Sequence, residues 1–196
     1  MASKLKTHGI TESTPQNLLL GAGAFYKDLV YDTATQAWSG TVLGATSGGG
    51  QVNLTPEYLQ PEIDGATVAV EGLIFKVADE ATMTVNLTEL NEDNLKNVLH
   101  LQEDTTSPMQ GYKKYISVRS IGSDAFLSNV AYVGTLTSGE QIIVRFPKAI
   151  CKGALELSTA NKETSTYEVT FTAVATFDQA DLEHIPYEIY YPQATV

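Results

Sequence analysis

The stretch TSTYEVTFTAVATF, residues 164–177, decides the fold class, because two kinds of side chain alternate along it. Between Tyr167 and Phe177 every second residue is apolar, whereas most of the residues between them are threonine. Alternation with a period of two places one set of side chains on each face of a β-strand. The stretch therefore predicts a long, half-buried strand with the side chain of Phe171 in the core.

The same alternation recurs along much of the chain and predicts a mainly β protein. In Ala81–Leu90 the apolar residues Met83 and Val85 alternate with threonines. In Ala66–Val77 the phase of the alternation slips at Glu71-Gly72, where one extra residue in a β-bulge would account for the slip. Further strands are expected over Leu18–Tyr31, Thr41–Thr46, Val52–Thr55, Tyr112–Arg119, Phe126–Leu136 and Gln141–Phe146.

One short segment, about residues 91–100, has the pattern of a helix instead. Asn91 is a good N-cap residue, and the acidic residues that follow it face the positive end of the helix dipole. Leu95, Val98 and Leu99 recur at the spacing of one helix face. We therefore expect one short α-helix that packs its apolar side against a sheet.

The composition limits the classes of partner. The chain of 196 residues has 12 lysines and arginines against 23 aspartates and glutamates, a formal net charge of −11. So acidic a surface argues against a protein that grips nucleic-acid phosphates or docks on an anionic membrane. Cys151 is the single cysteine, which excludes a disulfide within the chain. The length is that of one domain.

The positions of the polar, glycine-rich and proline-rich segments predict three parts. They are a polar leader over residues 1–15, a β domain over residues 16–183 and an extended C-terminal arm over residues 184–196. Residues 47–65 are rich in glycine and proline, lack periodicity, and are expected to form a long loop. Loops and arms of this kind commonly join subunits, so removal of Gly48–Pro61 is expected to abolish assembly but leave a folded monomer. The candidate contact residues are Gly48, Gly49, Gly50, Tyr58, Pro61 and Asp64 in the loop and Tyr187, Tyr190 and Tyr191 in the arm.

The sequence predicts no catalytic residue, cofactor or metal ion. The Gly21-Ala22-Gly23 pattern of a dinucleotide site fails, because Tyr26 stands where the third glycine belongs. His100 is interpreted as a cation at the C-terminal end of the helix, and Cys151 as a small buried apolar residue. An acidic turn, rather than a metal site, is the interpretation of the neighbouring residues Asp178, Asp181, Glu183 and His184.

A series of segments, taken in order, carries a family resemblance. The segments are Gly21-Ala22-Gly23-Ala24-Phe25-Tyr26, Leu43–Gly49, Asp64-Gly65, Val70-Glu71-Gly72, Met83–Leu99, Phe146-Pro147-Lys148-Ala149, Gly153, Leu157-Ser158 and Tyr167–Ala173. In their order and spacing they resemble the major tail tube proteins of tailed bacteriophages, particularly long-tailed phages of Gram-positive hosts. The resemblance covers about residues 16–180, so the tyrosine-rich arm lies outside it.

The resemblance implies a fold and an assembly. Two antiparallel sheets would pack as a sandwich or split barrel with one short flanking helix. Homohexameric rings would stack into a tube that conducts double-stranded DNA from the capsid into the host without specific binding. The implied partners are further copies of the chain and the tail-tip, tape-measure and tail-terminator proteins, with no membrane and no enzymatic activity. The implied location is the tail of the virion, after synthesis in the host cytoplasm.

The acidity fits a channel for DNA. Between Glu57 and Asp104 acidic residues far outnumber the two lysines, Lys76 and Lys96. Carboxylates that face the bore of a tube would repel phosphates and keep DNA from binding. The alternative is that these acids are ordinary solvated side chains. The candidate lumen-facing residues are Glu71, Asp79, Glu80 and Glu89.

Two other classes of function stay open at this stage. A β-sandwich that binds a carbohydrate or a receptor would share the strand pattern, although a sugar-binding domain usually exposes more aromatic side chains than the single tryptophan, Trp38, suggests. A hydrolase would need a carboxyl group with a raised pKa in a cleft. The number of acidic residues alone is no indication of such a site.

Overall fold

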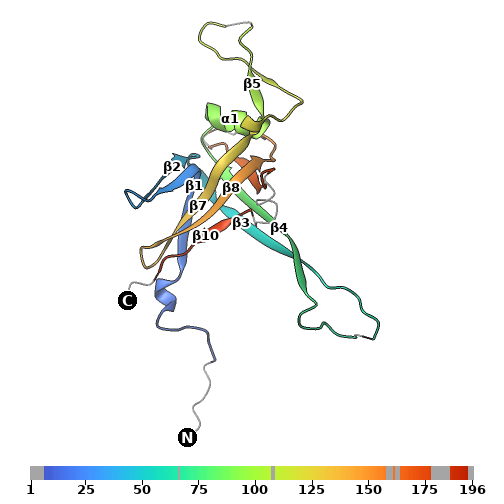
Figure 1. Cartoon of the computed structure of the whole chain (residues 1–196). Coiled ribbons are helices and arrows are strands. Elements are labelled where there is room, and N and C mark those ends of the chain that lie inside the picture. The colour runs from blue at the N-terminus through green and yellow to red at the C-terminus, as the bar shows by residue number, and fades with distance from the viewer. Residues whose placement is uncertain are drawn as a thin grey trace.

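The computed structural model describes residues 7–65, 67–106, 109–157, 161, 164–177 and 186–193. Over these residues the chain is mainly β, with two antiparallel sheets and one short α-helix, which confirms the predicted fold class (Figure 1). The strands are β1 (Leu19–Asp32), β2 (Ala37–Val42), β3 (Thr46–Leu59), β4 (Phe75–Leu87), β5 (Leu101–Glu103), β6 (Tyr115–Ser117), β7 (Phe126–Leu136), β8 (Gln141–Cys151), β9 (Tyr167–Ala173) and β10 (Glu188–Tyr190). The helical elements are α1 (Glu92–Leu99) and the short 3-10 turns η1 (Thr14–Gln16) and η2 (Ser123–Ala125).

The large sheet curls around the main core. Seven of its strands lie in the order β2-β1-β7-β8-β9-β4-β3, and β10 pairs with β8. Strand β8 pairs with β10 at residues 143–145 and with β9 at residues 149–151, so these two short strands share one of its edges. The segment after β2 helps to close the curl, because it contacts both ends of the strand order. The Leu43 N–H donates to the Phe25 carbonyl of β1, and the Thr88 N–H, just after β4, donates to the Ala45 carbonyl, both over 2.9 Å.

The main core is built from the apolar half of each alternating strand. On β4, Met83, Val85 and Leu87 are all fully buried. Phe171 of β9, which pairs with Met83, is buried as the alternation predicts. Full burial of an apolar side chain of this size contributes about 1.5–3 kcal/mol. The alternation within these strands is therefore a major source of the stability of the fold.

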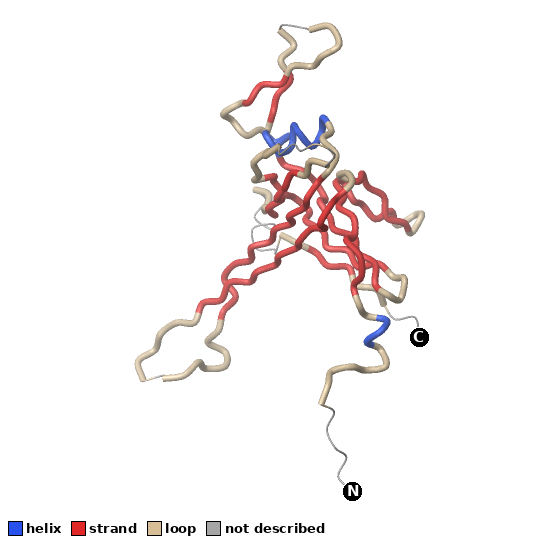
Figure 2. Tube along the Cα trace, turned by 180° about the vertical axis from the view of Figure 1, so that it is seen from behind, coloured by secondary structure: helices blue, strands red, loops and turns tan. Residues whose placement is uncertain are grey.

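The helix α1 covers one end of the curled sheet (Figure 2). The Asn91 side chain accepts a hydrogen bond from the Asn94 N–H over 2.8 Å, which caps the helix as predicted. The helix ends at His100, whose φ of 50° is left-handed. Asn94 is buried, and its side chain donates to the Leu43 carbonyl over 2.7 Å. This bond ties the helix to the segment that closes the curl.

The small sheet is the β5–β6 ribbon, which Glu92 joins to α1. The Glu92 carboxylate accepts hydrogen bonds from Lys96 (2.6 Å), Lys113 (3.0 Å) and the Tyr115 hydroxyl (2.6 Å). The hydrogen bond from Lys96, followed by those from Tyr115 and Lys113, lowers the pKa of Glu92 to about 2. Polar contacts on an exposed surface therefore help to hold the ribbon on the helix.

The predicted loop over residues 47–65 is wrong in its first part, because β3 continues to Leu59. Gly48 and Gly49 both have a φ of 77°, and the register of β3 against β4 shifts at this point. They form a β-bulge within the strand, where glycine is favoured because other residues rarely adopt a positive φ. The loop lies later in the chain, over residues 60–74.

Gly50 explains why a glycine run continues inside a strand. A Cβ atom at this position would lie 2.5 Å from the ring of Phe25 in β1. Glycine therefore lets β1 and β3, which are not neighbours in the sheet, approach each other closely across the core. This requirement depends on the folded partner strand, and the local sequence pattern does not contain it.

The predicted strand over Ala66–Val77 is also wrong, apart from its last residues, which belong to β4. The phase slip at Glu71-Gly72 is a turn, in which the Leu73 N–H donates to the Val70 carbonyl over 3.1 Å. Gly72 has a φ of 87°, which suits a turn rather than a bulged strand. Residue 66 lies outside the described residues.

Most other predicted strands are confirmed with shifted ends. Phe126–Leu136 is β7, as predicted, whereas the strand expected over Gln141–Phe146 continues to the end of β8. The strand expected over Tyr112–Arg119 shortens to β6, and the long strand expected over residues 164–177 shortens to β9. The single strand expected over Thr41–Thr46 is wrong, because residues 43–45 belong to no strand and link β2 to β3. The predicted leader and C-terminal arm are described only in part, because residues 1–6 and several residues around β10 lie outside the described ranges.

Candidate assembly surface

The β3–β4 hairpin extends well beyond the rest of the sheet (Figure 1, lower right). Strand β9 pairs with β4 only over residues 82–87, whereas β3 pairs with β4 as far as Leu59 and Phe75. Before residue 82, β4 therefore has β3 as its single strand partner in the described part of the chain. We call residues 56–80 the hairpin arm.

The hairpin arm exposes many large apolar side chains within a short length of chain. Each of them has at least 40% of its surface exposed. They are Tyr58, Leu59, Ile63, Val68, Val70, Ile74, Phe75 and Val77. Concentrations of exposed apolar side chains mark surfaces that bind partners, because contact between apolar surface and water is unfavourable. The hairpin arm is thus a candidate interaction surface that the single chain leaves uncovered.

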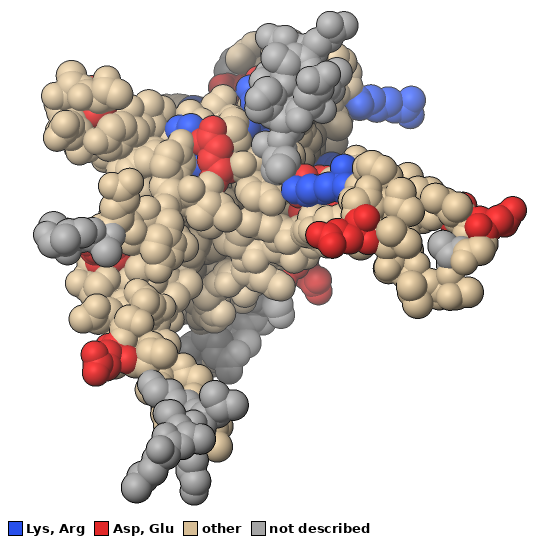
Figure 3. Space-filling view, turned by 60° about the horizontal axis from the view of Figure 1, so that its bottom comes forward, with Lys and Arg blue, Asp and Glu red and all other residues tan. Residues whose placement is uncertain are grey.

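The hairpin arm is also acidic. Its charged residues are Lys76 and the acids Glu57, Glu62, Asp64, Glu71, Asp79 and Glu80. Figure 3 shows acidic side chains at the end of the arm and nearer to the body, at the right of the view. Like charges on the arms of separate copies repel each other, so the arm favours a partner surface different from itself.

The structure divides the predicted loop contacts between two places. Tyr58, Pro61 and Asp64 lie in the exposed hairpin arm. The glycines at positions 48–50 lie at the opposite end of β3, where they form the bulge and the close approach to Phe25. The three glycines therefore serve the fold of β3, and the other three residues belong to the candidate interaction surface.

The four predicted lumen-facing acids do not share one surface of the chain. Asp79 and Glu80 are consecutive in β4, so their side chains point to opposite faces. The Asp79 side chain is only 7% exposed and lies 2.6 Å from the Lys76 ammonium. Glu71 lies in a turn of the hairpin arm, and Glu89 follows the end of β4. These four residues therefore form no single acidic surface on the chain, and a lumen-facing role for each of them stays a prediction.

The outward side of β3, β4 and β9 forms a surface that we call the polar face. Residues paired across neighbouring strands have their side chains on the same face of the sheet. On the outward face of these three strands, one set of paired residues contains no lysine or arginine. The polar face consists of Gln51, Asn53, Thr55, Glu80, Thr82, Thr84, Asn86, Glu168, Thr170 and Thr172. The hydroxyl oxygens of Thr84 and Thr170 are 3.0 Å apart. Of the predicted lumen residues, Glu80 alone lies on this face.

The C-terminal strand β10 lies on the sheet of its own chain. Glu188 pairs with Arg145 of β8, and its carboxylate accepts hydrogen bonds from Arg145 Nε (2.9 Å) and Nη2 (2.5 Å). The rings of Trp38 and Tyr190 meet edge to face with their centroids 4.8 Å apart. The Arg145 guanidinium lies over both rings, 5.9 Å and 5.4 Å from their centroids. Stacking and an ion pair thus hold β10 in place.

Of the predicted arm contacts, Tyr190 and Tyr191 lie at this cluster, whereas Tyr187 packs against the main core. The Tyr187 hydroxyl lies 3.5 Å from the Asp79 carboxylate, Tyr190 contacts Trp38, and Tyr191 is exposed. We call the groove between β1, β2, β8 and β10 the aromatic groove. Its walls include Val30, Tyr31, Trp38, Ile143, Tyr190 and Tyr191. Sequence reasoning missed this groove, because its residues come from segments far apart in the chain.

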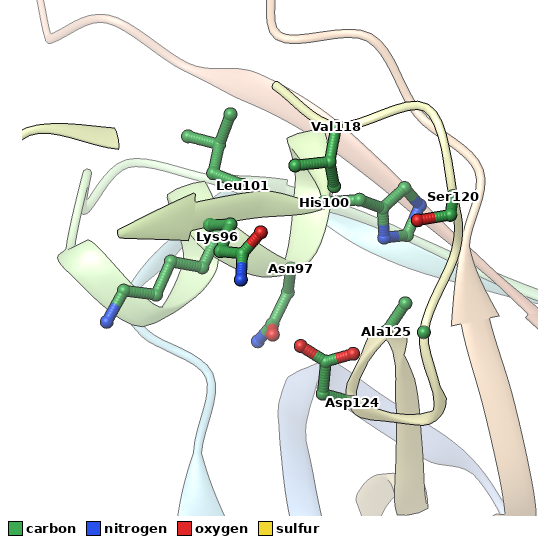
Figure 4. Close-up of a pocket in the computed structure, with 10 residues that line it drawn as sticks. Lys96, Asn97, His100, Leu101, Val118, Ser120, Asp124 and Ala125 are labelled. Atoms are coloured by element: carbon green, nitrogen blue, oxygen red, sulfur yellow. The ribbon is translucent and has the colours of Figure 1, made fainter. Parts of the chain in front are cut away.

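A separate pocket at the C-terminal end of α1 contains His100, Ser120 and Asp124 (Figure 4). These residue types could form a nucleophilic triad, which requires hydrogen bonds between them. His100 Nε2 instead lies 3.0 Å from the Cys151 carbonyl oxygen, and its Nδ1 is buried with no partner in the structure. Burial raises the pKa of the Cys151 thiol to about 11, which fits its interpretation as an apolar core residue. The pocket thus holds the residue types of a triad without its hydrogen bonds.

Among the described residues, no carboxyl group has a pKa that is clearly raised. Where the pKa of a described carboxyl group departs clearly from its ordinary value, it is lowered; the groups are Asp32, Glu92, Asp93, Asp104 and Glu188.

Within the described ranges, no three His, Cys, Asp or Glu side chains are grouped so as to hold a metal ion. The acidic turn over Asp178, Asp181, Glu183 and His184 lies outside those ranges. A search of the described helices finds none with the length and hydropathy needed to cross a membrane.

No protein-family model matches the chain, and no curated protein matches it. The assignment of a function therefore rests on the surfaces described above: the hairpin arm, the polar face and the aromatic groove.

Proposed function

We propose that the chain is a structural subunit of a bacteriophage tail tube, which polymerises as stacked hexameric rings around a channel for DNA. The observation that carries the proposal is the hairpin arm, which exposes apolar side chains along its length. Such a surface is stabilised when a neighbouring subunit covers it. The resemblance of residues 16–180 to tail tube proteins suggests the kind of assembly. The partners in this proposal are other copies and the tail-tip, tape-measure and tail-terminator proteins of the virion, and no enzymatic activity is assigned.

The open edges of the large sheet support an assembly of this kind. Strands β2 and β3 stand at the two ends of the strand order. Unpaired strand edges present backbone N–H and C=O groups that pair readily with a strand of another chain. In a closed ring, edges of adjacent subunits can pair and form one continuous barrel, which removes the exposed edges.

The polar face supports a channel for DNA. Its side chains are hydroxyls, amides and the carboxylates of Glu80 and Glu168, and one lysine, Lys152, lies at its edge in a pocket with Asn86, Glu168 and Thr170. Binding of nucleic-acid phosphates depends largely on lysine and arginine. A bore lined by this face would therefore let DNA pass without retaining it. A map of the tube with a basic bore would contradict this part of the proposal.

Electron microscopy of the purified chain at high concentration, fresh and after several days, tests the proposal. Six-fold rings or long tubes support it. The variants Leu59→Asp and Gln60→Asp add the same charge at adjacent exposed positions of the hairpin arm. We expect Leu59→Asp, which removes an apolar side chain, to abolish assembly and Gln60→Asp to retain it. A chain that stays monomeric alone and also in the presence of a tail-tip complex would contradict the proposal.

A second candidate function is a carbohydrate- or receptor-binding module, and the aromatic groove is the observation that favours it. Apolar and aromatic walls with a few polar groups are typical of sites for small ligands. The groove combines the rings of Tyr31, Trp38 and Tyr190 with the guanidinium of Arg145. This candidate predicts a monomer whose Tm rises when a saccharide that it binds is added, because a ligand of the native state stabilises it.

A further inference from the structure

The aromatic groove and the hairpin arm are two uncovered surfaces on opposite sides of the chain. The β1–β2 hairpin, which forms one wall of the groove, leaves the body on the side away from the β3–β4 arm in both views (Figures 1 and 2). The arm of a chain therefore does not reach its own groove. Two different surfaces on opposite sides of a subunit pair head to tail between copies, which is the geometry of a ring or filament rather than of a two-fold dimer.

The aromatic groove has the composition of a binding hot spot. Trp38 packs against Tyr31 and Tyr190, with ring centroids 5.2 Å and 4.8 Å away, and both tyrosines remain exposed. Tryptophan, tyrosine and arginine are the residue types that dominate the energetics of protein–protein interfaces. Exposed Val30 and Tyr191 widen the apolar surface around the rings. The groove is therefore suited to an apolar segment of a protein partner.

Charge favours the hairpin arm as that partner. Arg145 is the single charged residue among those that line the groove, and its ion pair with Glu188 leaves this site without net charge. The hairpin arm carries a clear excess of acids over its one lysine, Lys76. An acidic arm therefore meets less repulsion at this groove than at a second acidic arm.

We propose that the hairpin arm of one copy docks in the aromatic groove of the next copy, with Leu59 and Phe75 against the rings of Tyr31, Trp38 and Tyr190. Leu59 and Phe75 are paired across the hairpin, so their side chains share one face of the arm and can enter the groove together. This inference rests on the proposed function, because it specifies which surfaces of neighbouring subunits meet.

The fluorescence of Trp38 provides the test. Trp38 is the single tryptophan of the chain, so its emission reports on the groove alone. The protein that provides the groove, which we call the acceptor, is the full chain with Leu59→Asp and Phe75→Asp. It keeps the groove and loses the apolar surface of the arm. The protein that provides the arm, which we call the donor, is the full chain with Trp38→Phe. It keeps the arm and has no tryptophan emission. Titration of the acceptor with the donor then measures entry of an arm into the groove of another copy.

We expect a saturable shift of the Trp38 emission to shorter wavelength, because docking excludes water from the ring. The matched control donor combines Trp38→Phe with Leu59→Asp and Phe75→Asp, and we expect it to bind at least about tenfold more weakly. Both arm substitutions are at exposed positions, so the acceptor should keep the circular dichroism of the wild-type chain. Absence of a shift with a folded acceptor and a folded donor overturns the inference.

The outcomes separate this inference from the proposed function. A wild-type chain that forms rings or tubes, combined with no Trp38 shift, overturns the groove contact and leaves the tail tube standing. A wild-type chain that stays monomeric both alone and with a tail-tip complex, combined with no shift, contradicts both. A Trp38 shift that a panel of soluble oligosaccharides produces and the donor does not assigns the groove to a binding module and overturns the inference.

Discussion

The two ends of the β3–β4 hairpin are made of similar residues but differ in what covers them. At the body end, Met83 and Val85 of β4 are fully buried in the main core. At the far end of the same strand, Phe75 and Val77 are 49% and 52% exposed. Because both ends are rich in apolar residues, composition does not distinguish them. The comparison teaches that one hairpin contributes to two structures: the core of its own chain and, in our proposal, the interface with the next.

This difference predicts that substitutions at the two ends of the hairpin affect different properties of the protein. A substitution at the body end removes contacts that stabilise the folded monomer. A substitution at the far end leaves those contacts intact and removes surface that only a neighbouring copy covers. Stability and assembly should therefore be separable by mutation, and the following experiments are ordered from the largest expected effect to the smallest.

Shortening of the hairpin arm should have the largest effect. Residues 58–77 are replaced by Asn-Gly between Glu57 and Ala78, which are paired and suit a tight hairpin turn. We expect complete loss of rings and tubes in electron micrographs, with little change in the Tm of the monomer. Normal tubes from the shortened chain would show that the arm is not the assembly surface.

The structure also changes the deletion that the sequence alone suggests. Removal of Gly48–Pro61 would delete most of β3, including the bulge and the close approach of Gly50 to Phe25. We therefore expect this deletion to unfold the chain rather than leave a folded monomer. Circular dichroism and the thermal transition distinguish the two results.

Alanine substitutions at two phenylalanines compare the core with the arm directly. Phe171→Ala should lower the free energy of unfolding by about 3–5 kcal/mol, because the residue is buried and leaves a cavity. Phe75→Ala should lower it by less than about 1 kcal/mol, because the side chain is about half exposed. Urea unfolding of both monomeric variants measures the difference. Equal losses would mean that the arm is as much a part of the core as β9.

The closed end of the curl contains a buried polar contact between Asn94 and Leu43. Asn94→Ala removes the shorter of the two hydrogen bonds that the Leu43 carbonyl accepts, at 2.7 Å against 3.4 Å from the Asn91 side chain, so we expect a loss of about 1–3 kcal/mol in the free energy of unfolding. Asn97→Ala, in the same helix but only partly buried, serves as the control and should change stability by no more than about 0.5 kcal/mol. Similar losses for the two variants would contradict a special role for Asn94.

The contact between α1 and the β5–β6 ribbon should give the smallest effect, and one that depends on pH. The pKa of Glu92 falls from its ordinary value of 4.5 to about 2 in the folded chain, chiefly through the hydrogen bond from Lys96. A carboxyl group with a lowered folded pKa contributes stability above its unfolded pKa and loses it as the pH falls through the folded pKa. The Tm difference between wild type and Glu92→Gln should therefore shrink as the pH falls from 4.5 to about 2. A difference that stays constant over this range would exclude the Glu92 contact as its source.

Elements whose signals lie within a few residues could be predicted from the sequence. The alternation around Phe171 predicted β9, and Asn91 with the apolar spacing after it predicted α1. The glycines at 48–50 misled the prediction, because glycine marks loops, bulges and close approaches alike. Only the ring of Phe25, from a different strand, shows which of these roles Gly50 serves.

The candidate site could be predicted only in part. Pro61 and Asp64 were placed in a loop by the proline- and glycine-rich pattern around them, and the structure confirms it, whereas Tyr58 lies in β3. The aromatic groove was missed, because Trp38 and Arg145 meet only after β1, β2 and β8 have formed the sheet. The polar face was present in the sequence as the threonine half of the alternation, but its extent across three strands depends on their register.

The sequence by itself determined that this protein is an acidic, mainly β chain with one capped helix, because period, charge and capping are properties of short segments. The tertiary structure alone decided which apolar residues are core and which are uncovered, since Met83 and Phe75 belong to one strand and differ only in the strands and helix that lie beside them. It also decided that the aromatic groove and the hairpin arm lie on opposite sides of the molecule. Burial is a relation between distant segments, so it exists only once the chain has folded.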